Sequence, residues 1–571
     1  MAEAEGLYRT VPPGDPCYPD ALHLLGLLAS AGGRTQEALA LLGEAVRLRP
    51  EVAPFHNSLG RALDSLGMHC EAGLCFTQAL ACKPNYVEAQ VNFGNALHAL
   101  GLLEEALVQY EAALASQPEC VEALFNKAAA LSGLERFEQA EAVAWEALRR
   151  KPEAAEPWNV LSVVHFARHR FLDAEQCARR SVGLRPDCAE SWNNLGNALQ
   201  EQDRMEEAEA CYRAALRISP HLAEAHYNLG NARRRVLRLP EARACYEEAI
   251  RLNPGHIKAH WNLSLTLLLA GELERGWEEF EWRWRNPKTP PRRFRQPPWD
   301  GSPLEGRTIL LHAEQGLGDT IQFIRYADLV KRAGAAVVVE CPARLAPLVA
   351  TAPGVDRVVG AGTPLPEFDV HAPLMSLPRL VRTTLSSVPA RVPYLAVEEE
   401  RRQRWRERMA HERELRVGLA WKGNPLQPDD RFRSVSWETL APLTAVSGVT
   451  WFSLQYGERP GPSQGGPLVD LGPETEDLRD AAAAIEQLDL VISVDSAMAH
   501  LAGALGRPVW VLLAHLPDWR WLLGRQTTPW YPTARLFRQP RRGDWESVIA
   551  DAGEALIEDR SKGRSANRYA S

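Results

Sequence analysis

Apolar and polar positions along the chain follow two different patterns. In roughly the first half, Ala and Leu recur at the spacing of one helix face, with Glu and Arg between them, which predicts amphipathic helices. After residue 305, short apolar runs alternate with helical segments. Runs rich in Val, Ile and Leu are typical of strands that are buried on both faces of a parallel sheet. The pattern therefore predicts a helical array followed by an α/β region.

The helical half repeats itself every 34 residues. This pattern resembles the tetratricopeptide repeat, a helix–turn–helix unit of that length. Small residues let the two helices approach closely, and a proline stops the second helix. The prolines are Pro50, Pro84, Pro118, Pro152, Pro186, Pro220 and Pro254. Twelve residues before them stand Ala38, Ala72, Ala106, Ala140, Ala174, Ala208 and Ala242, and 24 residues before them Gly26, Gly60, Gly94, Ala128, Ser162, Gly196 and Gly230.

Seven full repeats are followed by a half repeat in which Gly276 replaces the usual alanine. Such arrays stack into a superhelix whose concave surface holds another chain. One position on the first helix of several repeats is an asparagine, and an amide can both donate to and accept from a peptide backbone. Two interpretations stay open: the row binds an acceptor in the groove, or each amide pairs with a neighbouring repeat. The row is Asn92, Asn126, Asn194, Asn228 and Asn262.

The second half is predicted to be two Rossmann-like halves that face a cleft. The runs "TILLHA", "AAVVVE", "RVVG" and "FDVHA" fall in residues 306–395. The runs "RVGLAWKG", "VTWFSLQYG", "LDLVISVD" and "RPVWVLLA" fall in the block 413–550. A charged helix, "EEERRQRWRERMAHER", joins the two blocks, and prolines in residues 285–305 separate them from the repeats.

Two loops at predicted strand ends carry the candidate chemistry, because ligands of such sheets bind at the carboxyl ends of strands. In "EQGLGDT", Gly316 and Gly318 permit a tight turn before a helix that begins near Asp319. In "SVDSAMAH", Asp495 ends a strand and Ser496 opens a helix, with His500 one turn further on the same face. A helix N-terminus, a hydroxyl and an imidazole suit a diphosphate. The alternatives are that Asp319 is a helix cap, and that the second loop is a serine cap with a packed histidine.

The segments "GLGDTIQFIRYADLVKRAGAAVVVE" and "DLVISVDSAMAHLAGALGRPV" resemble the ADP-heptose:lipopolysaccharide heptosyltransferases. These are GT-B glycosyltransferases that invert the anomeric centre without a metal. Closer still is a group of bacterial proteins that fuse tetratricopeptide repeats to this domain, with the tail "PDWRWLLGRQTTPWYPTARLFRQP". The layout is also similar to that of the protein O-GlcNAc transferases.

This resemblance implies roles for particular residues. The general base falls on Asp319, and the loop that binds the diphosphate falls on Asp495, Ser496 and His500. Two departures from the family pattern are the segment "KGNPLQPDDRFRSVSW" and Ala497, where glycine is usual. The remaining residues implied to contact the nucleotide sugar are Gly316 and Gly318 in the glycine turn, Lys422 or Arg433 at the phosphates, and Gln455 and Glu458 at the base and ribose.

The resemblance and the patterns together predict seven divisions of the chain. These are an N-terminal extension (1–18), the repeat superhelix (19–284), a proline-rich basic linker (285–305), an N-terminal Rossmann-like half (306–395), a connecting helix (396–412), a nucleotide-sugar-binding Rossmann-like half (413–558) and a flexible tail (559–571).

Composition and charge narrow the function. The net charge of −8 gives no support to nucleic-acid binding. The N-terminal residues lack the apolar core of a secretory signal, and no apolar stretch approaches the length of a membrane helix. The ten cysteines lack the clustered spacing of a disulfide framework or a zinc site, which favours a reducing cytoplasm.

The sequence therefore predicts a cytoplasmic glycosyltransferase that is guided by its repeats. It would move a hexosyl or heptosyl group from a nucleotide-diphosphate sugar to a hydroxyl of a protein or peptide, with inversion and without a metal or other cofactor. The main alternative is a catalytically inactive repeat scaffold for protein interactions. A GT-B-like sugar-nucleotide epimerase is the third possibility.

Overall fold

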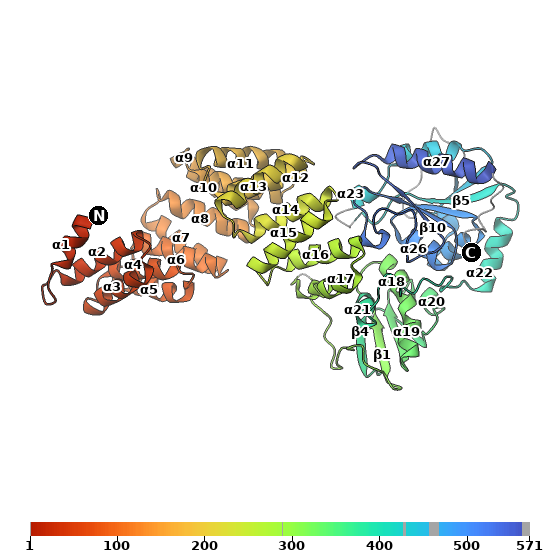
Figure 1. Ribbon diagram of the computed structural model, residues 1–571, viewed down its shortest axis with the longest axis horizontal. Helices are drawn as coiled ribbons and strands as arrows, with labels where there is room; N and C mark the ends of the chain where they lie inside the picture. Colours follow the sequence, from red (N-terminus) through yellow and green to blue (C-terminus); the bar gives the residue numbers. More distant parts are fainter. Residues whose placement is uncertain (1, 288, 426–429, 456–467, 562–571) are drawn as a thin grey trace. The chain divides into compact units, whose positions relative to one another are not determined.

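The computed structural model describes residues 2–287, 289–425, 430–455 and 468–561 (Figure 1). The chain forms two compact units, Met1–Ala232 and Arg233–Ser571. Within the described ranges, none of the helices combines the length and the apolarity that a membrane span requires.

The first unit is a series of helix pairs that follows the 34-residue period. Each second helix ends two residues before a repeat proline, as the missing amide of proline leads one to expect. The helices are α1 (Ala2–Arg9), α2 (Tyr18–Ala31), α3 (Thr35–Leu48), α4 (Ala53–Asp64), α5 (His69–Cys82), α6 (Val87–Ala99), α7 (Leu103–Ser116), α8 (Val121–Gly133), α9 (Phe137–Arg150), α10 (Ala155–Ala167), α11 (Phe171–Leu184), α12 (Ala189–Glu201), α13 (Met205–Ile218) and α14 (Ala223–Arg235).

The small repeat positions are where the two helices of a pair touch. A Cβ atom added at Gly60 would lie 2.6 Å from the Phe76 ring, and one added at Gly94 would lie 2.4 Å from the Tyr110 ring. The repeat alanines are fully buried in all seven full repeats. A larger side chain at either position would therefore force the helices apart, which explains the period that the sequence shows.

The second unit contains two parallel sheets. The first is ordered β3-β2-β1-β4 and the second β10-β9-β8-β5-β6-β7, and all registered neighbours are parallel. Read from β5, the second order is that of a complete Rossmann sheet, and the first order is its initial four strands. The strands are β1 (Thr308–His312), β2 (Ala336–Cys341), β3 (Arg357–Gly360), β4 (Val370–Pro373), β5 (Leu415–Ala420), β6 (Val449–Ser453), β7 (Leu468–Asp470), β8 (Leu490–Val494), β9 (Val509–Leu513) and β10 (Ala534–Arg538).

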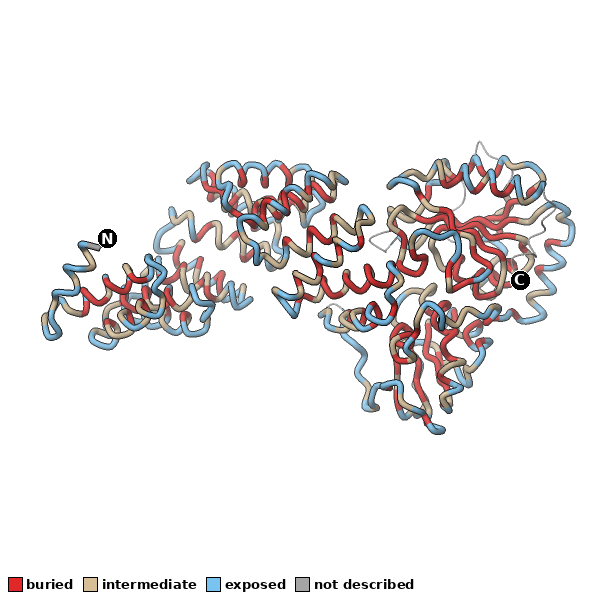
Figure 2. The backbone as a smooth tube through the Cα atoms, viewed as in Figure 1, coloured by how far each residue is buried: buried red, intermediate tan, exposed pale blue. Residues whose placement is uncertain are grey.

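Helices flank both sheets, and the strands between them are buried (Figure 2). The helices after the repeats are α18 (Leu317–Phe323), α19 (Ala327–Arg332), α20 (Ala346–Val349), α21 (Leu377–Leu380), α22 (Glu399–Arg408), α23 (Asp430–Arg433), α24 (Trp437–Leu440), α25 (Leu478–Gln487), α26 (Ala497–Ala504) and α27 (Trp545–Ser561). The short 3-10 helices are η1 (Glu281–Arg285), η2 (Ile324–Tyr326), η3 (Leu374–Ser376), η4 (Ala441–Ala445), η5 (Gly472–Glu474) and η6 (Trp519–Trp521).

The predicted fold class, a helical solenoid followed by an α/β region with two Rossmann-like halves, is confirmed. All eight predicted strands are present, and α22 lies in the predicted charged helix. The sequence did not predict β7 and β10, which are the two edges of the second sheet. Edge strands lack the continuous apolar run of a central strand: β7 has three residues, and β10, "ARLFR", carries two arginines. The seven predicted divisions of the chain stay predictions.

The last helices of the repeat array belong to the second unit, together with the sheets. These are α15 (Leu239–Leu252), α16 (Ile257–Ala270) and α17 (Leu273–Phe280). Trp277 of α17 packs edge-on against Trp519, with ring centroids 5.0 Å apart, and against Phe323 at 6.2 Å. The final repeat helix is therefore part of the core on which the α/β region rests.

A buried ion pair spans this junction. Arg283 in η1 is 7% exposed and donates to both carboxylate oxygens of Glu314, at 3.0 and 3.1 Å. Glu314 also accepts the backbone N–H of Met375 at 3.0 Å. Since Glu314 lies two residues before Gly316, the end of the repeat array fixes the loop that begins the candidate site.

Candidate active site

The candidate site lies where the strand order of each sheet reverses. In the first sheet that point is the carboxyl end of β1, next to β4, and in the second it is the carboxyl ends of β5 and β8. The crevice at such a switch point is the usual ligand site of open α/β sheets. The glycine turn follows β1, the Asp495 loop follows β8, and the segment with Lys422 and Arg433 follows β5.

Asp319 stands in the first turn of α18 with both carboxylate oxygens engaged. Oδ2 accepts the backbone N–H of Gly316 at 2.9 Å, and Oδ1 forms an ion pair with Nη2 of Arg520. Burial raises the pKa of the Asp319 carboxyl, and the positive charge of Arg520 opposes this by lowering it. α18 begins at Leu317 with Gly316 as its N-cap residue, so Asp319 is not the N-cap itself, and its bond to the Gly316 amide is a capping contact from the third helical position. The role of Asp319 as a general base stays a prediction.

The Asp495 loop leads directly into α26. Ser496 caps this helix: its Oγ accepts the backbone N–H of Met498 at 3.2 Å and lies 2.9 Å from the Ser493 hydroxyl. Burial and the negative charge of Asp518 raise the pKa of Asp495 to about 6. Asp495 thus titrates close to neutral pH, at the amino end of a helix whose dipole favours an anion.

His500 is packed inside the protein. It is 5% exposed, its Nδ1 lies 2.9 Å from the Tyr531 hydroxyl, and its ring is stacked on Trp521. Nε2 lies 3.9 Å from a carboxylate oxygen of Asp495. Burial lowers the pKa of His500 well below its ordinary value, so the imidazole is neutral at physiological pH. These contacts are those of the alternative interpretation, a serine cap with a packed histidine; binding of a diphosphate here stays a prediction.

The glycine turn and the Asp495 loop meet at Gly318. A Cβ atom at this position would lie 2.8 Å from Cδ2 of His500 and 3.7 Å from Cα of Ala497. Only a residue without a side chain lets α18 and α26 approach this closely, so Gly318 brings the two predicted loops together. Gly316 contributes its backbone N–H to Asp319 instead.

Two cationic residues, Arg433 and Lys422, are predicted to meet the phosphates. The positive charge of Arg433, in α23, lowers the pKa values of Asp319, Asp495 and His500, which places it within electrostatic range of both loops. Its Nε also donates to Asp430 at 2.9 Å. Lys422 is half-buried beyond the end of β5. Which of the two meets the phosphates stays a prediction.

The residues predicted at the base and ribose are only partly described. Oε1 of Gln455 accepts the backbone N–H groups of Trp421 at 3.0 Å and Lys422 at 2.9 Å. This amide thus ties the segment after β6 to the end of β5. Glu458 lies outside the described residues.

Sequence reasoning missed Arg520, which lies between the two loops. It is 7% exposed and donates to Asp518 at 2.8 Å and to Oε1 of Gln322 at 2.5 Å, in addition to its ion pair with Asp319. The signal was present in "PDWRWLL": an arginine between two tryptophans favours a guanidinium that is buried among rings.

The asparagine row links neighbouring repeats. Four of its members donate from Nδ2 to the Oδ1 atom of another asparagine, at 2.8 to 3.0 Å. This is the second of the two interpretations, although each amide has further hydrogen-bonding capacity. Asn262, at the same position in α16, is half-buried. The pairs are Asn92 with Asn57, Asn126 with Asn95, Asn194 with Asn159, and Asn228 with Asn193.

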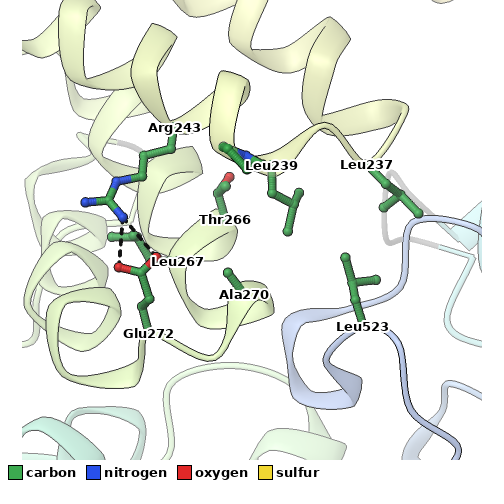
Figure 3. A pocket seen from close by; sticks show the side chains of 9 residues that line it. Leu237, Leu239, Arg243, Thr266, Leu267, Ala270, Glu272 and Leu523 are labelled. Atoms are coloured by element: carbon green, nitrogen blue, oxygen red, sulfur yellow. Dashed lines mark hydrogen bonds and ion pairs between the residues drawn. The ribbon is translucent and has the colours of Figure 1, made fainter.

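A cavity of about 520 Å³ lies between the last repeat helices and the loop that follows η6 (Figure 3). Leu523 projects from that loop, three residues after Arg520, and faces an apolar wall from α15, α16 and the turn before α15. Arg243 and Glu272 form an ion pair at 2.9 Å on one side. The other residues that line the cavity are Leu237, Leu239, Pro240, Thr266, Leu267 and Ala270.

Comparisons with known proteins agree with this architecture. Tetratricopeptide repeat models match residues 23–87, 91–155 and 187–255. The model of glycosyltransferase family 9 (heptosyltransferase) matches residues 461–531, which include Asp495, Ser496, His500 and Arg520 but not Asp319.

One curated relative is protein FlbA of Caulobacter vibrioides, 30% identical over 327 residues. The match covers 51% of this chain and 54% of FlbA, so this chain spans about half the length of that relative. A chain in the crystal structure of the APC/C hetero-tetramer Cut9-Hcn1 is 16% identical, with a TM-score of 0.40. That match covers 50% of this chain and 56% of the other. A tetratricopeptide repeat protein of Parabacteroides merdae is 18% identical, with a TM-score of 0.39. That match covers 44% of this chain and 98% of the other. The chain thus joins tetratricopeptide repeats to a domain of the glycosyltransferase family 9 (heptosyltransferase) type.

Proposed function

We propose that the protein transfers a sugar from a nucleotide-diphosphate sugar to an acceptor hydroxyl, with inversion and without a metal, in a GT-B arrangement of the two α/β halves. The observation that carries this proposal is the meeting of two loops at Gly318. A carboxylate, Asp319, stands on one loop, and the amino end of α26 opens on the other.

In this mechanism Asp319 accepts the proton of the acceptor hydroxyl. The oxygen forms a bond to the anomeric carbon from the face opposite the nucleotide. The bond between that carbon and the diphosphate oxygen breaks, and the electron pair leaves with the diphosphate. Backbone N–H groups at the start of α26 and the guanidinium of Arg433 stabilise the growing negative charge.

We extend the proposal to a protein or peptide acceptor. The repeats supply an array of the kind that holds polypeptides. The cavity beside Leu523 supports an approach from the last repeat helices, because it is walled by α15 and α16 on one side and by the loop of Arg520 on the other. An acceptor chain seated there could place an apolar side chain in the cavity. A cytoplasmic location remains part of the proposal.

The test is release of nucleotide diphosphate from a panel of nucleotide sugars, with and without peptide mixtures or small sugar acceptors. The wild type is expected to release the product from at least one donor. Asp319→Asn should bind that donor but turn it over at least about 100-fold more slowly, because an amide cannot accept the proton. Asp356→Asn is a matched control, since this acid directly precedes β3, at the amino edge of the first sheet, and pairs with Lys331.

One observation favours the scaffold instead. Both carboxylate oxygens of Asp319 are engaged, by Gly316 and Arg520, which would suit a purely structural residue. A scaffold predicts no product from any donor and no calorimetric binding of nucleoside diphosphates. If the Asp319→Asn variant still turns over the donor, the protein is an enzyme but Asp319 is not its general base.

A further inference from the structure

Arg520 belongs to the second α/β half, yet its guanidinium contacts the first. It stands in η6, after β9, and reaches Asp319 and Gln322 of α18. The bonds to Gln322 from Nε, to Asp518 from Nη1 and to Asp319 from Nη2 fix the plane of the guanidinium in three directions. The ring of Trp519 lies 4.4 Å from the guanidinium carbon.

The buried pair of Arg520 and Asp319 is weak evidence for a purely stabilising role. Arg520 and Asp319 are both largely removed from water, and the desolvation of a buried pair can exceed its Coulomb attraction. Asp518 adds a second negative charge beside the pair. An apolar contact between α18 and η6 would hold the two halves together as well. The charge on Arg520 therefore points to a need for ionised Asp319.

We propose that Arg520 is a positioning residue that keeps Asp319 ionised and aimed across the crevice, so that the carboxylate can act as a base. This inference rests on the proposed function for its catalytic meaning. The effect of Arg520 on the ionisation of Asp319 can be measured without any donor.

Several charges act on Asp319 besides Arg520. Asp518, from the turn before η6, raises the pKa of the Asp319 carboxyl, and Arg433 of α23 lowers it. α26 presents the neutral ring of His500 to the glycine turn. Burial raises the same pKa, so its two cationic neighbours act against burial and favour the ionised carboxylate. Arg520 is the neighbour in direct contact.

Arg520→Met keeps much of the volume and removes the charge. An opposite charge in contact lowers a carboxyl pKa by about 1–3 units, so the acidic limb of kcat/KM should move upward by about that amount. Arg520→Lys should restore the limb, even if the rate falls, because an ammonium group can still face Asp319. Asp518→Asn removes a charge that opposes ionisation of Asp319, so the acidic limb of this variant should move downward.

A readout without turnover uses unfolding in urea between pH 4 and 9. A carboxyl whose pKa is raised in the folded state binds more protons there than in the unfolded state. Stability then falls as pH rises from the unfolded pKa through the folded pKa. Each protein is compared with the same protein carrying Asp319→Asn in addition. The difference between the two stability curves is the part of the fall that is due to ionisation of Asp319. In Arg520→Met it should continue to a pH about 1–3 units higher than in the wild type.

Opposite shifts in Arg520→Met and Asp518→Asn would support the proposal, because general damage to the fold moves both variants alike. An unmoved limb and an unmoved unfolding curve in Arg520→Met would overturn it. Weaker binding of nucleoside diphosphate without either shift would also overturn it and make Arg520 a donor contact. If the wild type turns over no donor, the glycosyltransferase proposal fails, while the unfolding curves still decide the role of Arg520.

Discussion

Gly318→Ala probes the contact between the two loops with a single methyl group. The new Cβ would lie 2.8 Å from Cδ2 of His500, whereas carbon atoms prefer about 3.5–4.0 Å. One side must move by at least about 0.7 Å. His500 cannot retreat easily, because its far side is held by Tyr531 and Trp521.

Two effects of opposite sign determine the result. Overpacking in a tight core costs about 1–3 kcal/mol. Gly318 also lies within α18, where alanine is favoured over glycine by up to about 1 kcal/mol. The wild-type background should therefore show a net destabilisation of roughly 0.5–2 kcal/mol. With His500→Ala the obstacle is gone, and the same substitution should become neutral or stabilising.

The assay is urea unfolding followed by tryptophan fluorescence, for the wild type, both single variants and the double variant. Gly553→Ala in α27 calibrates the helix effect, because its Cβ would meet nothing closer than Leu443 at 3.5 Å. The expected coupling energy is about 1–3 kcal/mol. The same sign in both backgrounds, with coupling below about 0.5 kcal/mol, would refute the inferred contact between Gly318 and His500.

Two further predictions concern buried charges. Arg283→Met should destabilise the second unit by about 3–5 kcal/mol, because Glu314 is left charged and buried; adding Glu314→Gln should recover most of this loss in the same urea assay. Asp495→Asn should stabilise the protein by up to roughly 3 kcal/mol at pH 8 and by little at pH 4. The raised pKa means that ionisation of Asp495 opposes folding, and stability curves against pH that run parallel for the two proteins would contradict this.

Much of the architecture could be predicted because it depends on the spacing of residues that are close together in the sequence. The 34-residue period fixes where helices end and where they touch, as at Gly94 and Tyr110. The central strands are continuous apolar runs. The strand order places the loop after β1 at the switch point of the first sheet and the loops after β5 and β8 at that of the second. This is why Asp319 and Asp495 could be selected from sequence alone.

The partners of these residues could not be predicted in the same way. Arg520 lies 201 residues after Asp319 in the chain, and the contact exists only after both sheets have formed. The neutral state of His500 depends on burial by Tyr531 and Trp521, which no local pattern reports. The amides of the asparagine row pair across repeats, and their common position in the repeat is equally compatible with either interpretation.

The contact of Trp277 with Phe323 and Trp519 bears on how such fusion proteins can exchange parts during evolution. A recombination event in the proline-rich segment after η1 would separate Trp277 from its rings and Arg283 from Glu314. The last repeat helices and the α/β halves would then each face a surface to which they do not fit. An exchange further upstream, among the repeats of the first unit, would disturb only helix contacts that recur in every repeat. Lineages should therefore vary in repeat number and repeat sequence, while the final helix pair and the α/β halves are inherited as one block.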